Sequence, residues 1–360
     1  MTHAPQGLEI RPVSIVPTID SPDAADFVAM VEVRNAVLAE VNGHADESIT
    51  PRELLAVFQP DEYQQRSLWL VLLDGVAVGR AGVDIPNEDG SILAFWYIDL
   101  LPAIWGRGIG SAVLELIEQT ARAHGRTVLQ AWTAHPAGEG PRIMAPTGFG
   151  SIPDDHAARF ARRHGYTLEQ VERNSALVLA DAAPRLEHLL ETAAEASAAY
   201  RVVSWQLPTP PEFVAGYAWM KSRMVTDAPS AEIEFDEEVW DAARLARHER
   251  PYLDAGRALL VTAAQHIDSG ELCAFNELVI GNDRTEATHQ EDTLVLKEHR
   301  GHRLGMRVKC AGLLEWRHIA PLSPRVLTYN AEENRPMLDI NEAIGFAPIA
   351  YEGAWKKVLT

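Results

Sequence analysis

Residues 98–111 read IDLLPAIWGRGIGS and residues 293–305 read TLVLKEHRGHRLG, and these two stretches decide the fold of the chain. Each follows a strand-like run and precedes a helix-like run, which extends to about Glu118 and Trp316 respectively. A helix N-terminus leaves backbone N–H groups free, and a tight glycine turn lets them face a phosphate. Two such turns with matching flanks indicate a duplicated domain that binds a phosphate-bearing cofactor.

The composition fits a globular protein of a reducing compartment. Hydrophobic residues make up 47% and charged residues 23% of the sequence, and no run approaches the roughly 18 apolar residues of a membrane span. Residues 1–12 have neither the apolar core nor the basic flank of a signal peptide. Cys273 and Cys310 are the only cysteines, and each is interpreted as a small buried hydrophobe rather than a reactive thiol. We therefore expect a cytoplasmic protein without a membrane partner.

The charge balance argues against a nucleic-acid partner. The formal net charge is −19, and no basic stripe interleaved with aromatic residues offsets it. An acidic surface suits a cationic small molecule, and a merely solvated acidic surface explains the balance equally well.

The spacing of the turns predicts two tandem domains. Gly110 and Gly305 are 195 residues apart (305 − 110), which is too long for a solenoid repeat. We place an N-terminal domain at 1–180, a linker helix at 181–200 and a C-terminal domain at 201–360. The expected fold class is α+β, with each domain a mixed, mostly antiparallel sheet flanked by helices.

Both halves show the same predicted order of elements. The first has a helix over 21–40, strands over 69–73, 76–83 and 92–100, a helix after the turn, and a strand over 128–133. The second has helices over 213–224 and 237–250, strands over 258–266, 271–280 and 286–296, a helix after the turn, and a strand over 325–329. Asp74-Gly75 predicts a hairpin turn between the first two strands.

Two common phosphate loops do not fit the first turn. A dinucleotide-binding loop requires a further glycine where Ser111 stands and a carboxylate about 20 residues on, but the next strand offers Gln130 and Ala131. A nucleotide-hydrolase loop requires Gly-Lys-Ser/Thr, which the sequence lacks.

Both turns instead resemble the acyl-CoA-binding signature of the GNAT N-acetyltransferase superfamily, Arg/Gln-x-x-Gly-x-Gly/Ala. The second turn supplies Arg300 and Gly305 but has Arg303 in place of the middle glycine. The first supplies Gly108 and Gly110 but has Trp105 in place of Arg or Gln.

The resemblance extends to a closing helix-to-strand segment in each half. Residues 160–166 read FARRHGY and residues 341–346 read NEAIGF, and both are similar to the segment that usually ends in Gly-Phe or Gly-Tyr in this family. The motifs are short, and their paired, ordered recurrence covers most of both halves.

The resemblance implies acetyl-CoA as cofactor. Backbone N–H groups of 105–110 and 300–305 would hold the pyrophosphate, and the strands before each turn would pair with the pantetheine arm. The implied cofactor-binding residues are Leu101, Trp105, Gly106, Arg107, Gly108, Ile109, Gly110, Ser111, Leu294, Leu296, Arg300, Gly301, His302, Arg303, Leu304, Gly305 and Asn330. Asn330 also fits a purely structural role in a turn.

Acetyl transfer to an amine requires a base, because an alkylamine with a pKa of about 10.4 is protonated at neutral pH. Glu277 lies mid-strand, where members of the family often carry a catalytic glutamate, although a glutamate there can also face solvent. Asp292 is a weaker candidate. The matching strand of the first half offers only Asp84, and Asp99 in the next strand is equally well explained as structural.

The general acid of many GNAT enzymes, a tyrosine four residues before the closing glycine, has no counterpart. Ala161 and Asn341 stand in those positions, and neither ionises. A catalytically silent acyl-CoA-binding or scaffold protein is therefore the alternative to an enzyme.

Three further segments bear on the site. The acidic segment 226–238 suits the wall of an acceptor site in the second domain, or a solvated loop. His299 and His302 make a poor cation site beside two arginines, so no metal is predicted. The loop over 136–155 has no counterpart in the second half and is expected to modify the first site.

We therefore expect an acetyl-CoA-dependent N-acetyltransferase that acts on a small-molecule amine. Glu277 and Arg300 favour catalysis in the C-terminal domain. The resemblance specifies neither which amine is acylated nor the oligomeric state.

Overall fold

The computed structural model describes residues 5–136, 139–227, 233–236 and 238–359. The chain forms two compact units. Unit 1 comprises residues 1–171, 231–235 and 350–360, and unit 2 comprises residues 172–230 and 236–349. Each unit is a mixed, mostly antiparallel sheet flanked by helices, which confirms the predicted fold class.

Unit 1 has the strand order β1-β2-β3-β4-β5-β14-β8. β4 and β5 form a parallel pair, while β1–β2, β2–β3, β3–β4 and β5–β14 are antiparallel. Its elements are β1 (Leu8–Pro12), α1 (Ala25–Asn42), α2 (Pro51–Phe58), β2 (Gln64–Leu73), β3 (Val76–Pro86), β4 (Leu93–Leu100), η2 (Pro102–Ile104), α3 (Ile109–Ala123), β5 (Val128–Pro136), β6 (Arg142–Met144), β7 (Ser151–Pro153), α4 (His156–Arg163), the first part of β8 (Thr167–Val178) and β14 (Ala347–Val358) from Ala350 on.

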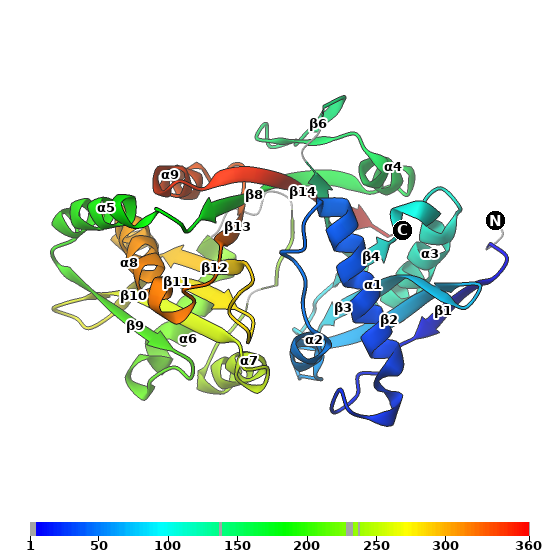
Figure 1. Cartoon of the computed structure of the whole chain (residues 1–360), viewed down its shortest axis with the longest axis horizontal. Coiled ribbons are helices and arrows are strands. Elements are labelled where there is room, and N and C mark those ends of the chain that lie inside the picture. Colours follow the sequence, from blue (N-terminus) through cyan, green and yellow to red (C-terminus); the bar gives the residue numbers. More distant parts are fainter. Residues whose placement is uncertain (1–4, 137–138, 228–232, 237, 360) are drawn as a thin grey trace. The chain divides into compact units, whose positions relative to one another are not determined.

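Helices cover both faces of this sheet because β2 alternates between two apolar faces (Figure 1). Leu68, Leu70 and Leu72 pack in one cluster with α1 and α2. Trp69 and Val71 pack in the other with α3. Successive side chains of a strand point to opposite faces, so this run of apolar residues supplies two cores at once.

Unit 2 repeats the plan with the order β8-β13-β12-β11-β10-β9, in which β12 and β13 are the parallel pair. Leu260 and Leu278 pack with α8, whereas Val261 and Val279 pack with α6. Its elements are the last part of β8, α5 (Ala183–Ala196), β9 (Tyr200–Gln206), α6 (Pro211–Asp227), α7 (Ala242–Asp254), β10 (Ala258–His266), β11 (Leu272–Ile280), β12 (Thr288–Val295), η3 (Lys297–His299), α8 (Leu304–Ile319), β13 (Arg325–Ala331) and α9 (Arg335–Ile344).

The units are not continuous in sequence. The last strand, β14, pairs with β5 from Ala350↔Pro136 to Val358↔Val128 and so belongs to unit 1. The two units therefore differ at this strand from the predicted linear domains 1–180 and 201–360. The helix expected in the linker is present as α5 and lies in unit 2.

Two helix starts show why local signals matter. Helix α2 was not predicted, although Thr50 and Glu53 form a capping box that the sequence displays. The helix expected over 237–250 begins at Ala242, because the Asp241 side chain accepts a hydrogen bond from the N–H of Arg244 and caps it there.

The segment after β5 carries the two-stranded β6–β7 hairpin, with residues 137–138 outside the described part. Within the described ranges, every helix is too short or too polar to cross a bilayer.

Candidate functional site

The two glycine turns have the same backbone. Each runs from the end of β4 or β12 through η2 or η3 into α3 or α8. The N-cap residue is left-handed in both, with φ of 83° at Gly108 and 54° at Arg303. Among the described residues no side chain caps either helix, so the first N–H groups remain available to a ligand.

Trp105 and Arg300 make the same hydrogen bond. The indole Nε1 of Trp105 donates to the carbonyl of Leu100 at 2.9 Å. The guanidinium Nε of Arg300 donates to the carbonyl of Val295, the equivalent strand end, at 3.2 Å. The departure of the first turn from the signature is therefore a replacement of one N–H donor by another.

The last glycine of each turn lies against the closing helix. A Cβ on Gly110 would lie 3.2 Å from Phe160 in α4, and one on Gly305 would lie 3.0 Å from Ile340 in α9. Both glycines thus permit the close approach of the closing helix.

The strands before the turns diverge from their parallel neighbours. β4 pairs with β5 only from Leu93 to Phe95, and β12 pairs with β13 only from Thr288 to Gln290. Both β4 and β12 continue for several residues toward the turn without a parallel partner among the described residues. An extended ligand arm can bond to backbone exposed in this way.

A cleft of about 1200 Å³ opens in unit 1 at this divergence. Its walls come from the end of α1, from β4 and β5, and from α4, and its floor includes the whole first turn from Ile104 to Ser111. The predicted residues from Trp105 to Ser111 therefore line the cleft. Leu101 does not, whereas its neighbours Leu100 and Pro102 do.

Two histidines that the sequence interpretation overlooked also line this cleft. The ring of His156 stacks on Trp105, with centroids 4.4 Å apart and planes 5° apart. His164 Nε2 lies 3.0 Å from the Ser111 hydroxyl. Burial lowers the pKa of both imidazoles below the usual value, which favours their neutral form.

The residues predicted around the second turn fall into two groups. Leu294, Leu296, Leu304 and Gly305 are buried in unit 2, and the three leucines belong to its hydrophobic clusters. Arg300, Gly301, His302 and Arg303 are exposed on the turn.

Glu277 is buried rather than facing solvent. Its carboxylate accepts hydrogen bonds from the Tyr217 hydroxyl and from Lys221 Nζ at 3.1 Å. Lys221 also donates to Asp292 at 2.6 Å. The ladder between β11 and β12 shifts register here, so that Glu277 faces Glu291 and Asp292 together. Such bulges re-aim side chains and are frequent beside active sites.

The three ionisable groups of this cluster differ in the direction of their pKa shifts. Burial would lower the pKa of Lys221, but Asp292 and Glu277 raise it above its usual value, so the ammonium persists. Burial tends to raise the pKa of Asp292, yet Lys221 lowers it overall. Burial raises the pKa of Glu277 to about 7 despite Lys221. Lys221 and Asp292 thus form the ionised pair, and Glu277 titrates near neutrality.

The position of the absent tyrosine in unit 2 is occupied by a buried polar chain. Lys309 Nζ donates to Asn341 Oδ1 at 2.7 Å, and Asn341 Nδ2 donates to Asn330 Oδ1 at 2.6 Å. Burial lowers the pKa of Lys309 to about 7. Asn330, predicted as a ligand contact, is therefore engaged by Asn341. In unit 1 the equivalent Ala161 is a buried apolar residue.

The acidic segment expected beside the second site belongs in part to the first unit, which corrects that expectation. Residues 228–232 and 237 lie outside the described part. The neighbouring Phe235 stacks on Phe95 in β4, with centroids 6.4 Å apart, and the backbone of Glu234 exchanges two hydrogen bonds of 2.8 Å with the amide of Gln130 in β5. This segment packs where the strands of unit 1 begin to diverge.

Comparison with known proteins agrees with this geometry. A model of the acetyltransferase (GNAT) family matches residues 37–139, which include β4, the first turn and α3. The chain is similar to the solved structure of a tandem GNAT protein from the clavulanic acid biosynthesis pathway, with 25% identity, a TM-score of 0.75 and 98% of each chain covered. It is also similar to a GCN5-related N-acetyltransferase from Sphaerobacter thermophilus, with 15% identity, a TM-score of 0.63, and 99% of this chain and 97% of that chain covered. No curated protein matches the sequence.

The fold, the turn geometry and these similarities together define an acyltransferase of the GNAT type. More particularly, the chain is similar along 98% of its length to a tandem GNAT protein. The class of reaction is acetyl transfer.

Proposed function

We propose that the chain is an acetyl-CoA-dependent N-acetyltransferase of a small-molecule amine and that the cleft of unit 1 binds the cofactor. The observation that carries the proposal is this cleft of about 1200 Å³, which opens at an uncapped helix N-terminus beside an unpaired strand edge. N–H groups of Trp105 to Ser111 would hold the pyrophosphate, and β4 beyond Phe95 would hold the pantetheine arm.

We further propose that Glu277 accepts the proton that the acceptor ammonium must lose, with catalysis in the C-terminal half. When bound, acetyl-CoA supplies an activated acetyl thioester. A base must then be ionised near neutral pH, and the pKa of about 7 at Glu277 meets this requirement. The second turn repeats the backbone of the first, which supports a second thioester site near β12.

The cofactor site is tested by calorimetric titration of the full chain with acetyl-CoA. Gly108→Glu should weaken binding at least tenfold, because it places a negative charge at the helix N-terminus. Gly108→Arg is the matched control, since it imposes the same left-handed strain and Arg303 already stands at that position in the second turn. Equal losses in both variants would contradict the proposed electrostatic cradle.

The reaction is tested by acetyl-CoA-dependent thiol release with a panel of polyamines, aminoglycosides, amino acids and lysine peptides. Thiol release that depends on one class of amine supports the enzyme. Binding of acetyl-CoA without thiol release across the panel would overturn the enzymatic proposal in favour of a silent acyl-CoA-binding protein.

A further inference from the structure

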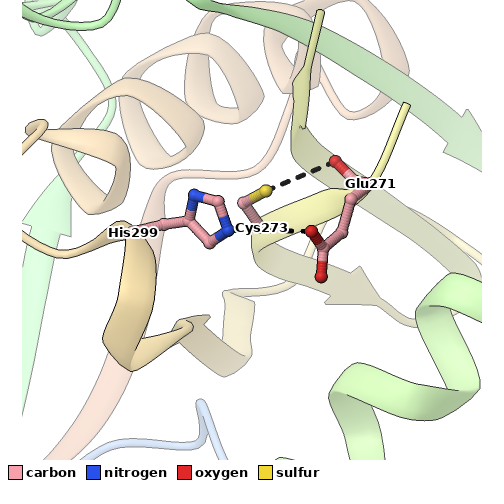
Figure 2. A group of neighbouring side chains, drawn as sticks. All are labelled: Glu271, Cys273 and His299. Atoms are coloured by element: carbon pink, nitrogen blue, oxygen red, sulfur yellow. Dashed lines mark hydrogen bonds and ion pairs between the residues drawn. The ribbon is translucent and has the colours of Figure 1, made fainter. Parts of the chain in front are cut away.

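We propose that Glu271, Cys273 and His299 of unit 2 form a binding site for a single zinc ion. Each offers one ligand atom, and these atoms all lie within 4.8 Å of one another. Figure 2 shows the imidazole, thiol and carboxylate converging from two elements that are distant in sequence. Glu271 immediately precedes β11, Cys273 lies at the start of β11, and His299 ends η3 within the second glycine turn.

The distances between the ligand atoms suit tetrahedral coordination of zinc after small side-chain movements. Zinc with bonds of about 2.0–2.3 Å places neighbouring ligand atoms roughly 3.3–3.6 Å apart. His299 Nε2 is already 3.8 Å from Glu271 Oε2. Glu271 follows the hairpin turn at Asp268 and is exposed, so its carboxylate can move by the required distance of about 1 Å.

A tyrosine on the far side of the ring fixes the orientation of His299. The Tyr200 hydroxyl lies 2.9 Å from His299 Nδ1, and the Tyr200 ring contacts the rings of His266 and His302. When the hydroxyl accepts the Nδ1 hydrogen, the Nε2 lone pair is left free on the side of Glu271 and Cys273. Metal-binding histidines are held in this way by an outer partner that fixes tautomer and ring orientation.

The donor set selects the ion. One thiolate with one imidazole and one carboxylate suits zinc, because calcium and magnesium prefer oxygen ligands alone. Three protein ligands leave a fourth position for water, and the exposure of Glu271 leaves that position open to solvent. The sequence-based expectation of no metal rested on His299 and His302, whereas the other two ligands are Cys273 in β11 and Glu271 just before it.

The bound ion would join β11 to the second turn. These elements already share one backbone bond, from the N–H of Leu296 to the carbonyl of Cys273 at 3.0 Å. A zinc ion bound one residue before Arg300 would fix the path of the turn into α8.

The experiment uses the full chain without a histidine tag, freed of metal by dialysis against a chelator and titrated with Co²⁺ as a spectroscopic probe. We expect one Co²⁺ per chain with a thiolate-to-cobalt charge-transfer band, and displacement of Co²⁺ by Zn²⁺. Cys273→Ser should abolish this band, while Cys310→Ser, which alters the other buried cysteine, should retain it.

Two further variants test the site while leaving the thiol in place. Glu271→Gln changes an exposed side chain and should weaken binding by at least the 10- to 100-fold that is typical even for outer-shell changes, and Tyr200→Phe should fall in that range. Absence of the band in the wild-type chain, its persistence in Cys273→Ser, or its equal loss in Cys310→Ser would overturn the proposal.

Discussion

Gly82 in unit 1 and Glu277 in unit 2 occupy the same place in the repeat, separated by the same 195 residues as the turn glycines (277 − 82). Opposite Gly82 lies Tyr97, whose ring leaves no room for a side chain, since a Cβ on Gly82 would be 2.4 Å from it. Opposite Glu277, the equivalent of Tyr97 is Asp292, and a register shift brings the two carboxylates to Lys221. At this place unit 1 holds the aromatic ring of Tyr97, whereas unit 2 holds the ionisable cluster of Glu277, Asp292 and Lys221.

The two units therefore share a fold but differ in the kind of side chain that fills the interior at this place. In unit 1, Tyr97 lines the open cleft, burial raises its pKa to about 12, and its hydroxyl lacks a hydrogen-bond partner among the described residues. In unit 2 the ionisable groups are paired and one of them titrates near pH 7. The two repeats therefore differ in the chemistry of their interiors, and the following variants test that comparison.

The largest expected effect is on turnover in Glu277→Gln. A positioned base contributes a factor of about 10² to 10⁴ in rate, so the variant should lose turnover by that order while its affinity for acetyl-CoA is nearly unchanged. Because Glu277 must be ionised to accept a proton, wild-type kcat/KM should rise with pH through about 7 and then level off. Steady-state kinetics across pH should show that this inflection disappears in the variant. A fully active Glu277→Gln enzyme would place the base elsewhere, with His156 in the cleft of unit 1 as the next candidate.

The second effect is on the stability of unit 2. Lys221→Met removes the one cation between two carboxylates, and breaking a buried pair costs about 3–5 kcal/mol. Urea unfolding measures the loss. The matched control is Arg250→Met, whose ion pair with Asp254 is exposed, so a change of about 0–1 kcal/mol is expected. Similar losses in both variants would show that the cluster around Glu277 contributes little to folding.

The third effect concerns the aromatic interior of unit 1. Gly82→Ala should cost about 1–3 kcal/mol, because the new methyl group forces the Tyr97 ring to move. In the background of Tyr97→Ala the same substitution should cost much less, and thermal unfolding of the four proteins gives the coupling. An unchanged cost in that background would mean that the ring is not what excludes a side chain.

The smallest expected effect is on stability, and it distinguishes the N-cap residues Gly108 and Arg303. Gly108→Ala adds a methyl group in open space but at φ of 83°, so it should destabilise by about 1 kcal/mol through backbone strain alone. Arg303→Gly relieves the same strain in the second turn and should stabilise by less than about 1 kcal/mol, because glycine also gains freedom in the unfolded chain. Differential scanning calorimetry resolves both shifts, and opposite signs are expected.

Much of the fold was predictable because local patterns carry it. Apolar alternation located the strands, and Asp74-Gly75 forms the predicted hairpin turn with positive φ at both residues. The strand from Ala258 to His266 was predicted with its observed bounds. The pairing of β14 with β5 was not predictable in this way, since nothing in the sequence near Ala350 specifies a partner more than 200 residues earlier.

The candidate site was predictable only where backbone conformation defines it. The sequence identified both turns, including Gly108 and Gly305, because few residues accept those positions. It did not identify Lys221 or Tyr217 as partners of Glu277, since these contacts require α6 to pack on β11. Trp105 counted as a departure from the signature, and its role became clear only from the bond of its indole to Leu100.

The place of β14 also has a consequence for synthesis of the protein. Unit 1 is translated first, yet its sheet lacks a strand beside β5 until residues 350–358 leave the ribosome. At about 5–20 residues per second, that strand follows the end of β8 by roughly 10–35 s. During this interval β5 presents an open edge of the kind that recruits foreign strands. Unit 1 is thus the first unit to be synthesised, but its sheet is completed only when the last strand of the chain, β14, has been made.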